Sequence, residues 1–103
     1  MEGHSLISTD ILASYAADAA LEIDGVLRLV EGMRPRHHGV RVQNADGVVA
    51  VELHLALDWG VSAPAVCTAV QKRVAEYLGR MADLPEATVD VVVDDIGAPP
   101  KGA

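Results

Sequence analysis

The stretch RPRHHGVRV, at residues 34–42, gathers three arginines and two adjacent histidines in nine residues of an acidic chain. Side chains of these types can ligate a metal ion, bind phosphate or contact a nucleic-acid backbone. A fourth interpretation is a solvated loop that leads into a strand. The residues around this stretch, and their spacing, decide between the four.

The two histidines do not form a recognisable metal site. His37 and His38 are adjacent, so in an extended segment their side chains diverge and cannot readily chelate one ion together. The chain has no Cys-x-x-Cys pair, no His-x-x-x-His pair and no acidic calcium-binding loop, which are the usual spacings of metal ligands. We therefore expect solvated histidines, no metal and no other cofactor.

A nucleophile with activating partners is also missing from the pattern. Cys67 is predicted to lie in the first turns of a helix, where the helix dipole could lower the pKa of its thiol. No histidine or asparagine partner can be identified for it, so a small apolar residue beside the core is the better interpretation. Ser8 and Ser62 precede helical patterns and are best explained as helix caps.

The carboxylates do not suggest acid–base catalysis either. Asp94 and Asp95 lie near the end of one predicted strand, and Asp58 ends another. Adjacent residues of a strand face opposite sides, so Asp94 and Asp95 should not form an acid–base pair. Solvated carboxylates are the better interpretation, and the sequence does not predict an enzyme.

Phosphate and nucleic-acid binding have weak support. The chain contains neither a Gly-x-Gly-x-x-Gly nor a Gly-x-x-x-x-Gly-Lys motif, and its formal net charge is −7. Such a charge repels nucleic acid as a whole, although a local basic patch is still possible. The alternative hypothesis is a KH-like RNA-binding module that uses the basic 34–41 segment. Its Gly-x-x-Gly signature is absent, and the segment has no interleaved aromatic residues.

The first predicted element is a helix over about residues 10–23, with Ser8 or Thr9 as its N-cap and Gly25 as its stop. Its apolar positions recur at helical spacing: Ile11, Leu12, Tyr15, Ala16, Ala19 and Ile23. Residues 26–38 are ambiguous and are interpreted as a connecting loop with a short turn or strand.

An antiparallel hairpin is the strongest signal in the chain. One strand covers about residues 39–43, residues 44–47 make the turn, and the second strand covers about residues 48–58. Apolar residues in the second strand alternate with polar ones, so one face is buried: Val49, Val51, Leu53, Leu55 and Leu57 point one way, and Glu52, His54 and Asp58 the other.

A second helix follows from Ser62 to about Met81, and a third strand covers about residues 88–96. We therefore predict an α+β fold, a two-layer α-β-β-α-β domain whose three-stranded, mostly antiparallel sheet carries two helices on one face. Residues 7–96 form this single domain, after a flexible N-terminus at 1–6 and before a disordered Gly/Pro tail at 97–103.

The open face of this sheet is the candidate interaction surface, together with the basic loop beside it. Four of the eight basic residues fall within residues 28–41, whereas all the charged residues of the stretch 83–95 are acidic. Such segregated charge favours head-to-tail contact or an oppositely charged partner. The candidate contact residues are Arg34, Arg36, His37, His38, Arg41, Glu52, His54, Asp90 and Asp94.

Targeting signals are not apparent in the sequence. The first residues lack the basic start and apolar core of a signal peptide, and no apolar run reaches the ~18 residues of a membrane span. A single cysteine cannot form an internal disulfide. We expect a cytoplasmic protein.

The sequence resembles the alkaline shock protein family, also called the envelope stress response family. The family's opening helix pattern matches Ile7-Ser8, Ile11-Leu12, Tyr15-Ala16, Ala19-Ala20, Glu22 and Gly25-Val26. Its later motifs match Val40, Val42, Trp59-Gly60, Pro64, Val70-Gln71, Val74 and the strand from Val89 to Ile96. The resemblance covers about residues 7–96, and its specificity comes from the order and spacing of these motifs.

The resemblance implies a small non-enzymatic protein of Gram-positive bacteria, associated with cell-envelope stress. It further implies self-association as a homo-oligomer, binding to a membrane-anchored protein, or both. Membrane association would come from such a partner, without direct insertion, and nucleic acid is not an expected partner. The family supplies no catalytic residues to carry over.

Overall fold

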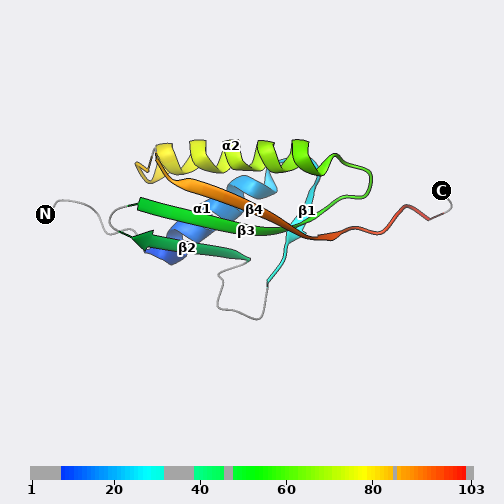
Figure 1. Cartoon of the computed structure of the whole chain (residues 1–103), viewed down its shortest axis with the longest axis horizontal. Helices are drawn as coiled ribbons and strands as arrows, with labels where there is room; N and C mark the ends of the chain where they lie inside the picture. The colour runs from blue at the N-terminus through cyan, green and yellow to red at the C-terminus, as the bar shows by residue number, and fades with distance from the viewer. Residues whose placement is uncertain (1–7, 32–38, 46–47, 85, 102–103) are drawn as a thin grey trace, which may run out of the picture.

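The computed structural model describes residues 8–31, 39–45, 48–84 and 86–101. Six elements follow one another along the chain (Figure 1): α1 (Thr9–Leu21), β1 (Val26–Leu29), β2 (Val40–Ala45), β3 (Val48–Leu57), α2 (Ala63–Met81) and β4 (Thr88–Ile96).

The central strand of the sheet is β3, which pairs with all three other strands. β4 lies parallel to it and pairs with residues 50–57. β2 is antiparallel and pairs with residues 48–53, and β1 is antiparallel and pairs with residues 55–57. Because β4 occupies one edge of β3 along nearly its full length, β1 and β2 must follow one another along the other edge.

Along one edge of β3, the pairing strand changes from β2 to β1 at His54. Its backbone N–H donates to the carbonyl of Gly39 at 3.0 Å, and its carbonyl accepts from the N–H of Val30 at 2.8 Å. Val30 and Gly39 are therefore held together on one residue of β3. In the sequence these two residues lie on either side of the basic segment that begins at residue 34.

The predicted fold class is confirmed, with one correction to the number of strands. The sheet has four strands instead of three, and the order is α-β-β-β-α-β, because residues 26–29 of the predicted connecting loop form β1. Four residues are too few to show a reliable alternation. They become a strand because β3 extends beyond β2 and offers unpaired backbone groups at residues 55–57.

Both predicted N-caps are confirmed. The hydroxyl of Ser8 accepts a hydrogen bond from the N–H of Ile11 at 3.1 Å, and that of Ser62 accepts from Ala65 at 3.3 Å. Pro64 occupies the first turn of α2, where a missing N–H removes no helical bond. Each helix thus begins where the sequence predicts, within one residue.

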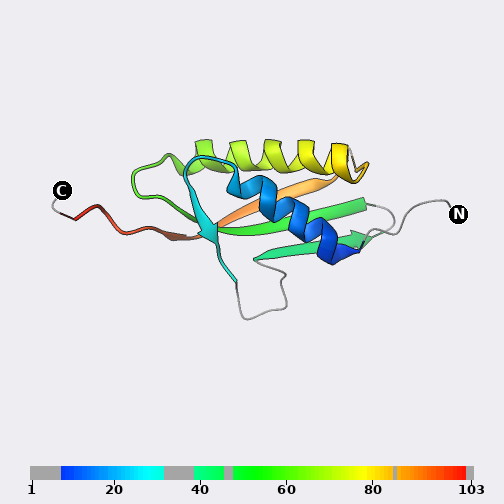
Figure 2. The ribbon, with the colours of Figure 1, turned by 180° about the vertical axis from the view of Figure 1, so that it is seen from behind.

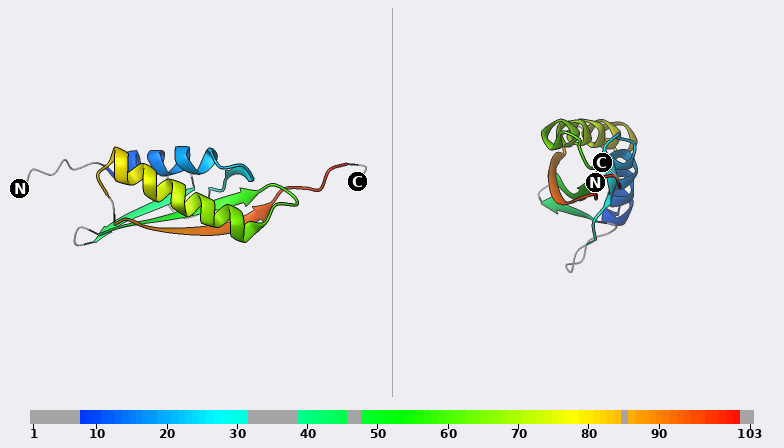
Figure 3. Two further views of the ribbon diagram at one scale, coloured as in Figure 1. Left: turned by 90° about the horizontal axis from the view of Figure 1, so that it is seen from above. Right: turned by 90° about the vertical axis from the view of Figure 1, so that its right-hand side faces the viewer.

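Both helices lie on the same side of the sheet. From behind, α1 passes in front of β2 and β3 (Figure 2). Two further views show the helices as one layer and the strands as another (Figure 3). Alanines on the buried side of α1, which include Ala16, Ala19 and Ala20, have no exposed surface. Their small size lets the helix approach the sheet closely.

The core is the apolar row of β3 packed under the two helices. Leu53, Leu55 and Leu57 are at most 1% exposed, and the burial of each such side chain contributes about 1.5–3 kcal/mol. From α2 the row meets Val70, Val74 and Leu78, all fully buried. The apolar side chains that alternate along β3 and those that recur at helical spacing along α2 therefore pack together in one hydrophobic layer.

The two tyrosines join the helices. The rings of Tyr15 on α1 and Tyr77 on α2 pack edge to face, with centroids 5.8 Å apart. The guanidinium of Arg73 lies 5.4 Å from the Tyr77 centroid and bonds to Glu22 at 2.8 and 2.9 Å. These aromatic rings serve the helix–helix contact and leave the open sheet face without tyrosine.

The chain ends of the predicted domain are only partly described. Residues 97–101 form no helix or strand, and the N–H of Gly97 still bonds to the carbonyl of Leu57 at 2.7 Å. The predicted flexible segment 1–6 and the last two residues of the predicted tail lie outside the described residues.

Two glycines allow a test of the close approach of Gly39 to Val30 beside His54. Gly39 and Gly60 both have positive φ, +80° and +86°. A Cβ on Gly39 would lie 2.8 Å from the backbone oxygen of Val30, whereas one on Gly60 would meet nothing within 4 Å. We expect Gly60→Ala to cost about 1–2 kcal/mol of unfolding free energy, and Gly39→Ala about 1–3 kcal/mol more. Urea denaturation measures both, and equal losses would contradict the close approach.

Candidate interaction site on the open sheet face

The side chains on the open face alternate with the core row. Arg41 of β2, Glu52 of β3 and Asp90 of β4 are register partners, so a basic and two acidic side chains cross the sheet in one line. His54 and its partner Val92 form the next line. In Figure 1 neither helix passes over this face of β2 and β3.

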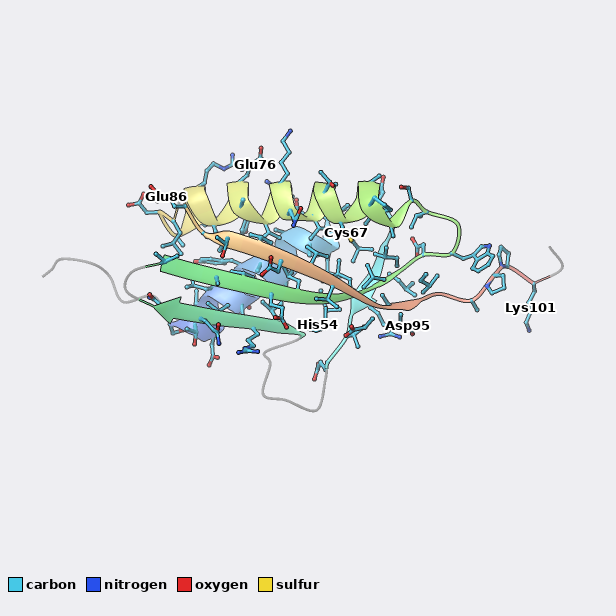
Figure 4. All side chains as sticks on the ribbon, in the orientation of Figure 1. His54, Cys67, Glu76, Glu86, Asp95 and Lys101 are labelled. Atoms are coloured by element: carbon cyan, nitrogen blue, oxygen red, sulfur yellow. The ribbon has the colours of Figure 1, made fainter. Side chains whose placement is uncertain are left out.

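The open face centres on His54, whose ring is held between two carboxylates. Its Nε2 lies 2.6 Å from Oε2 of Glu52, and its Nδ1 lies 2.7 Å from Oδ2 of Asp94. Only 15% of the His54 side chain is exposed, so water competes weakly for these contacts. Figure 4 shows His54 in the middle part of the sheet.

Both ring nitrogens of His54 face carboxylate oxygens. An ionised carboxylate only accepts hydrogen bonds, and a neutral imidazole can donate from one nitrogen alone. Each ring nitrogen of His54 has a carboxylate oxygen within hydrogen-bond distance, so the two contacts together fix the orientation of the ring. His54, Glu52 and Asp94 then act as one charge-assisted unit on the sheet surface.

A second ion pair crosses β3 beside this unit. Nη2 of Arg28 on β1 lies 3.1 Å from Oδ2 of Asp95 on β4, and Ala56 of β3 is the register partner of both residues. Ala56 is fully buried although it alternates with the core row, because the pair covers it. Both charged side chains are more than half exposed, so the pair contributes little to stability.

A β-bulge in β4 explains why both aspartates reach the open face. The register of β4 shifts between Leu55 and Ala56 of β3, so that Asp95, instead of Asp94, pairs with Ala56. The prediction that Asp94 and Asp95 face opposite sides is therefore wrong, because a bulge breaks the strict alternation of a strand. They bind different side chains, those of His54 and Arg28, and so form no acid–base pair with each other.

The hollow beside these charges is small. A shallow hollow of about 50 Å³ lies there, far below the ~300–1,000 Å³ of typical small-molecule sites. Its lining comes from all three long strands: Arg41, Gln43, Ala50, Val51, Glu52 and Asp90. The geometry suits a macromolecular surface better than a bound metabolite.

The structure brings together five of the nine predicted contact residues: Arg41, Glu52, His54, Asp90 and Asp94 lie on the open face. The other four, Arg34, Arg36, His37 and His38, lie outside the described residues. Arg28 and Asp95 were missed. No local signal could have identified them, since β1 is short and the bulge depends on pairing with β3.

The metal and nucleophile hypotheses gain nothing from the structure. Among the residues it describes, no group of three or more histidine, cysteine or acidic side chains could hold a metal ion. Burial raises the pKa of the Cys67 thiol. The suggestion that the helix dipole lowers it is therefore wrong, because desolvation of the thiolate outweighs the dipole.

Known proteins share this fold and this sequence. The model of the alkaline shock protein 23 family, described as having a cell envelope-related function, matches residues 1–98. A curated relative of Bacillus subtilis (strain 168), titled "Uncharacterized protein YqhY", is 30% identical over 88 residues. The alignment covers 76% of this chain and 65% of that relative, so the chain spans less than two thirds of the relative's length.

Solved structures of the MamM CTD have a similar fold. The one titled "MamM-CTD 215-293" has a TM-score of 0.62 at 14% identity, and the match covers 85% of this chain and 99% of that one. A nickel form gives 0.60 at 13% identity, covering 84% and 96%. At such low identity these structures show the fold alone.

The chain therefore belongs to the alkaline shock protein 23 family, whose function is related to the cell envelope. This confirms the family resemblance of the sequence. Within the described residues, no helix is both long enough and apolar enough to cross a membrane.

The His54–Asp94 contact can be tested by a double-mutant cycle. We expect His54→Ala to cost about 1–2 kcal/mol of unfolding free energy, because it removes the shared partner of two carboxylates. Coupling to Asp94→Ala should be about 1 kcal/mol. The matched control is the cycle of Arg28→Ala and Asp95→Ala on the same face, where coupling should stay below about 0.5 kcal/mol. Equal coupling in both cycles would contradict the special role of His54.

The pKa of Cys67 can be tested by thiol reactivity against pH. Because burial raises this pKa, the thiolate fraction at any pH is smaller than for an ordinary cysteine. The rate of reaction with a disulfide reagent should therefore rise at higher pH than for glutathione. The chain unfolded in urea should lose this difference, and a folded profile shifted to lower pH would refute the assignment.

Proposed function

We propose that this chain is a non-enzymatic interaction domain of the cell-envelope stress response, which acts through self-association or through a membrane-anchored partner protein. Membership of the alkaline shock protein 23 family supports the link to the envelope. In this proposal the protein is cytoplasmic, and any membrane attachment comes from the partner.

The observation that carries the proposal is the open sheet face with its charged network. Three strands present the unit of Glu52, His54 and Asp94, with Arg41 and Asp90 beside it. The hollow between these residues is too small for a metabolite. A flat surface of fixed, alternating charges provides orientation and specificity in protein–protein contacts.

The proposed contact surface includes the basic loop as well as the open face. Arg34, Arg36, His37 and His38 belong to the segment that joins Val30 and Gly39, and these two residues bond to the backbone of His54. In this proposal the loop supplies the positive side of the contact, and the acidic stretch at residues 83–95 of a neighbouring copy supplies the negative side.

The nucleic-acid alternative has no supporting observation on the described part of the open face. Glu52, Asp90 and Asp94 bring three acids to the centre of that face, against Arg41 and His54. Single-stranded nucleic acids bind through stacking on aromatic rings. Both tyrosines are engaged at the helix–helix contact, and the exposed Trp59 lies beyond the end of β3. Charge and ring placement therefore both favour a protein partner.

Light scattering coupled to size exclusion tests the proposal at low and high salt. We expect oligomers whose mass falls as salt increases, since screening weakens contacts between the loop and the acidic stretch. Arg34→Glu with Arg36→Glu should reduce the mass at low salt, whereas Lys72→Glu on the exposed side of α2 should not.

A chain that is monomeric at both salts would refute self-association. The partner branch would then be tested by affinity capture from membranes of a related bacterium, with His54→Ala as the matched control. We expect the natural chain to retain a membrane protein that the folded His54→Ala variant loses. Capture of no membrane protein by the natural chain would refute that branch as well.

A further inference from the structure

The two long edges of the sheet differ in how far their backbone groups are blocked. The β4 edge has side-chain hydrogen bonds near both of its ends. Nε2 of Gln71 on α2 donates to the carbonyl of Val89 at 3.1 Å, and Oδ1 of Asp95 accepts from the N–H of Ile96 at 2.9 Å. Together with the bulge and three aspartates in β4, these contacts are typical of an edge protected against another strand.

The β2 edge lacks such protection within the part of the chain that the structure describes. The N–H of His54 bonds to Gly39, so alternate residues from there, Arg41 and Gln43, also hydrogen bond to β3. The residues between them, Val40, Val42 and Asn44, direct their backbone groups away from the sheet. Among the described side chains, none caps these groups, and β2 contains no acidic residue.

We propose that the β2 edge binds the β2 edge of a second copy, in an antiparallel pairing about a two-fold axis at Val42. Two four-stranded sheets then become one continuous sheet of eight strands. This inference rests on the self-association branch of the proposed function. It adds a second contact between copies, beside the one from the basic loop to the acidic stretch.

Several registers match outward backbone groups with one another, and the one with Val42 on the two-fold axis is the register that pairs all three of Val40, Val42 and Asn44. With Val42 opposite Val42 of the second copy, Val40 lies opposite Asn44, and Arg41 lies opposite Gln43. Each Arg41 thus faces a neutral hydrogen-bonding side chain on the open face, twice per dimer. Moving the two-fold axis by one residue, from Val42 to Arg41, would place the two Arg41 side chains opposite each other. Like charges in that position are unfavourable.

Self-complementarity favours a second copy over an unrelated strand. The sequence VRVQNA pairs with its own antiparallel copy through matched apolar and polar partners. Each copy carries a net charge of −7, so two copies repel least where acids are absent, as they are in β2.

Charge variants of Gln43 test the register directly. Gln43→Glu places a carboxylate opposite each Arg41 and should tighten the dimer about three- to thirtyfold, because two cross-strand pairs change per dimer. Gln43→Arg should weaken it by a similar factor. The combination Arg41→Glu with Gln43→Arg should restore affinity. Sedimentation over a concentration series measures the dissociation constants, and circular dichroism confirms folding.

Thr68, exposed on α2, supplies the matched control for net charge. Thr68→Glu and Thr68→Arg make the same charge changes away from the proposed edge. General repulsion in an acidic chain predicts weaker association for added Glu and tighter association for added Arg, opposite to the paired-edge expectation. Gln43 variants that follow the Thr68 pattern would overturn the β2 pairing and leave self-association intact. A chain that stays monomeric throughout would overturn both.

Discussion

The hydrogen-bond ladders of β3 are the constraint on which the remaining structure depends. β3 pairs with every other strand and has an apolar row on one face, covered by both helices. Because side chains alternate along a strand, the order that buries Leu53 and Leu55 also fixes Glu52 and His54 on the opposite face. Core and candidate interaction site are two consequences of one register, and a slip by one residue would exchange them.

The open face acquires its organisation from non-local contacts around His54. The side chain of His54 joins Glu52 and Asp94, while its backbone holds Val30 and Gly39. His54 thereby links the charged surface to Val30 and Gly39, the two residues that flank the basic segment in the sequence. A fixed charged surface of this kind supports the proposed role in protein–protein contact.

Much of the fold could be predicted from local patterns, since both helices carry serine caps and β3 alternates over ten residues. The alternation of side chains along β3 also correctly predicted that Glu52 and His54 lie on one face of the sheet. By contrast, β1 has four residues, and its pairing with the end of β3 is a tertiary effect. The bulge at Asp94 and Asp95, and therefore the ion pair with Arg28, depends on strands distant in sequence, which no local pattern encodes.

We propose that this domain binds its partners through the sheet, by the open face and the β2 edge. The most direct measurement is a dilution series of amide spectra of the ¹⁵N-labelled protein, assigned residue by residue. We expect concentration-dependent shifts of the amide signals of Val40, Val42 and Asn44 and of the open face around His54, with the signals of the outer surface of α2 unchanged. Shifts concentrated on α2, with β2 unchanged at all concentrations, would contradict it.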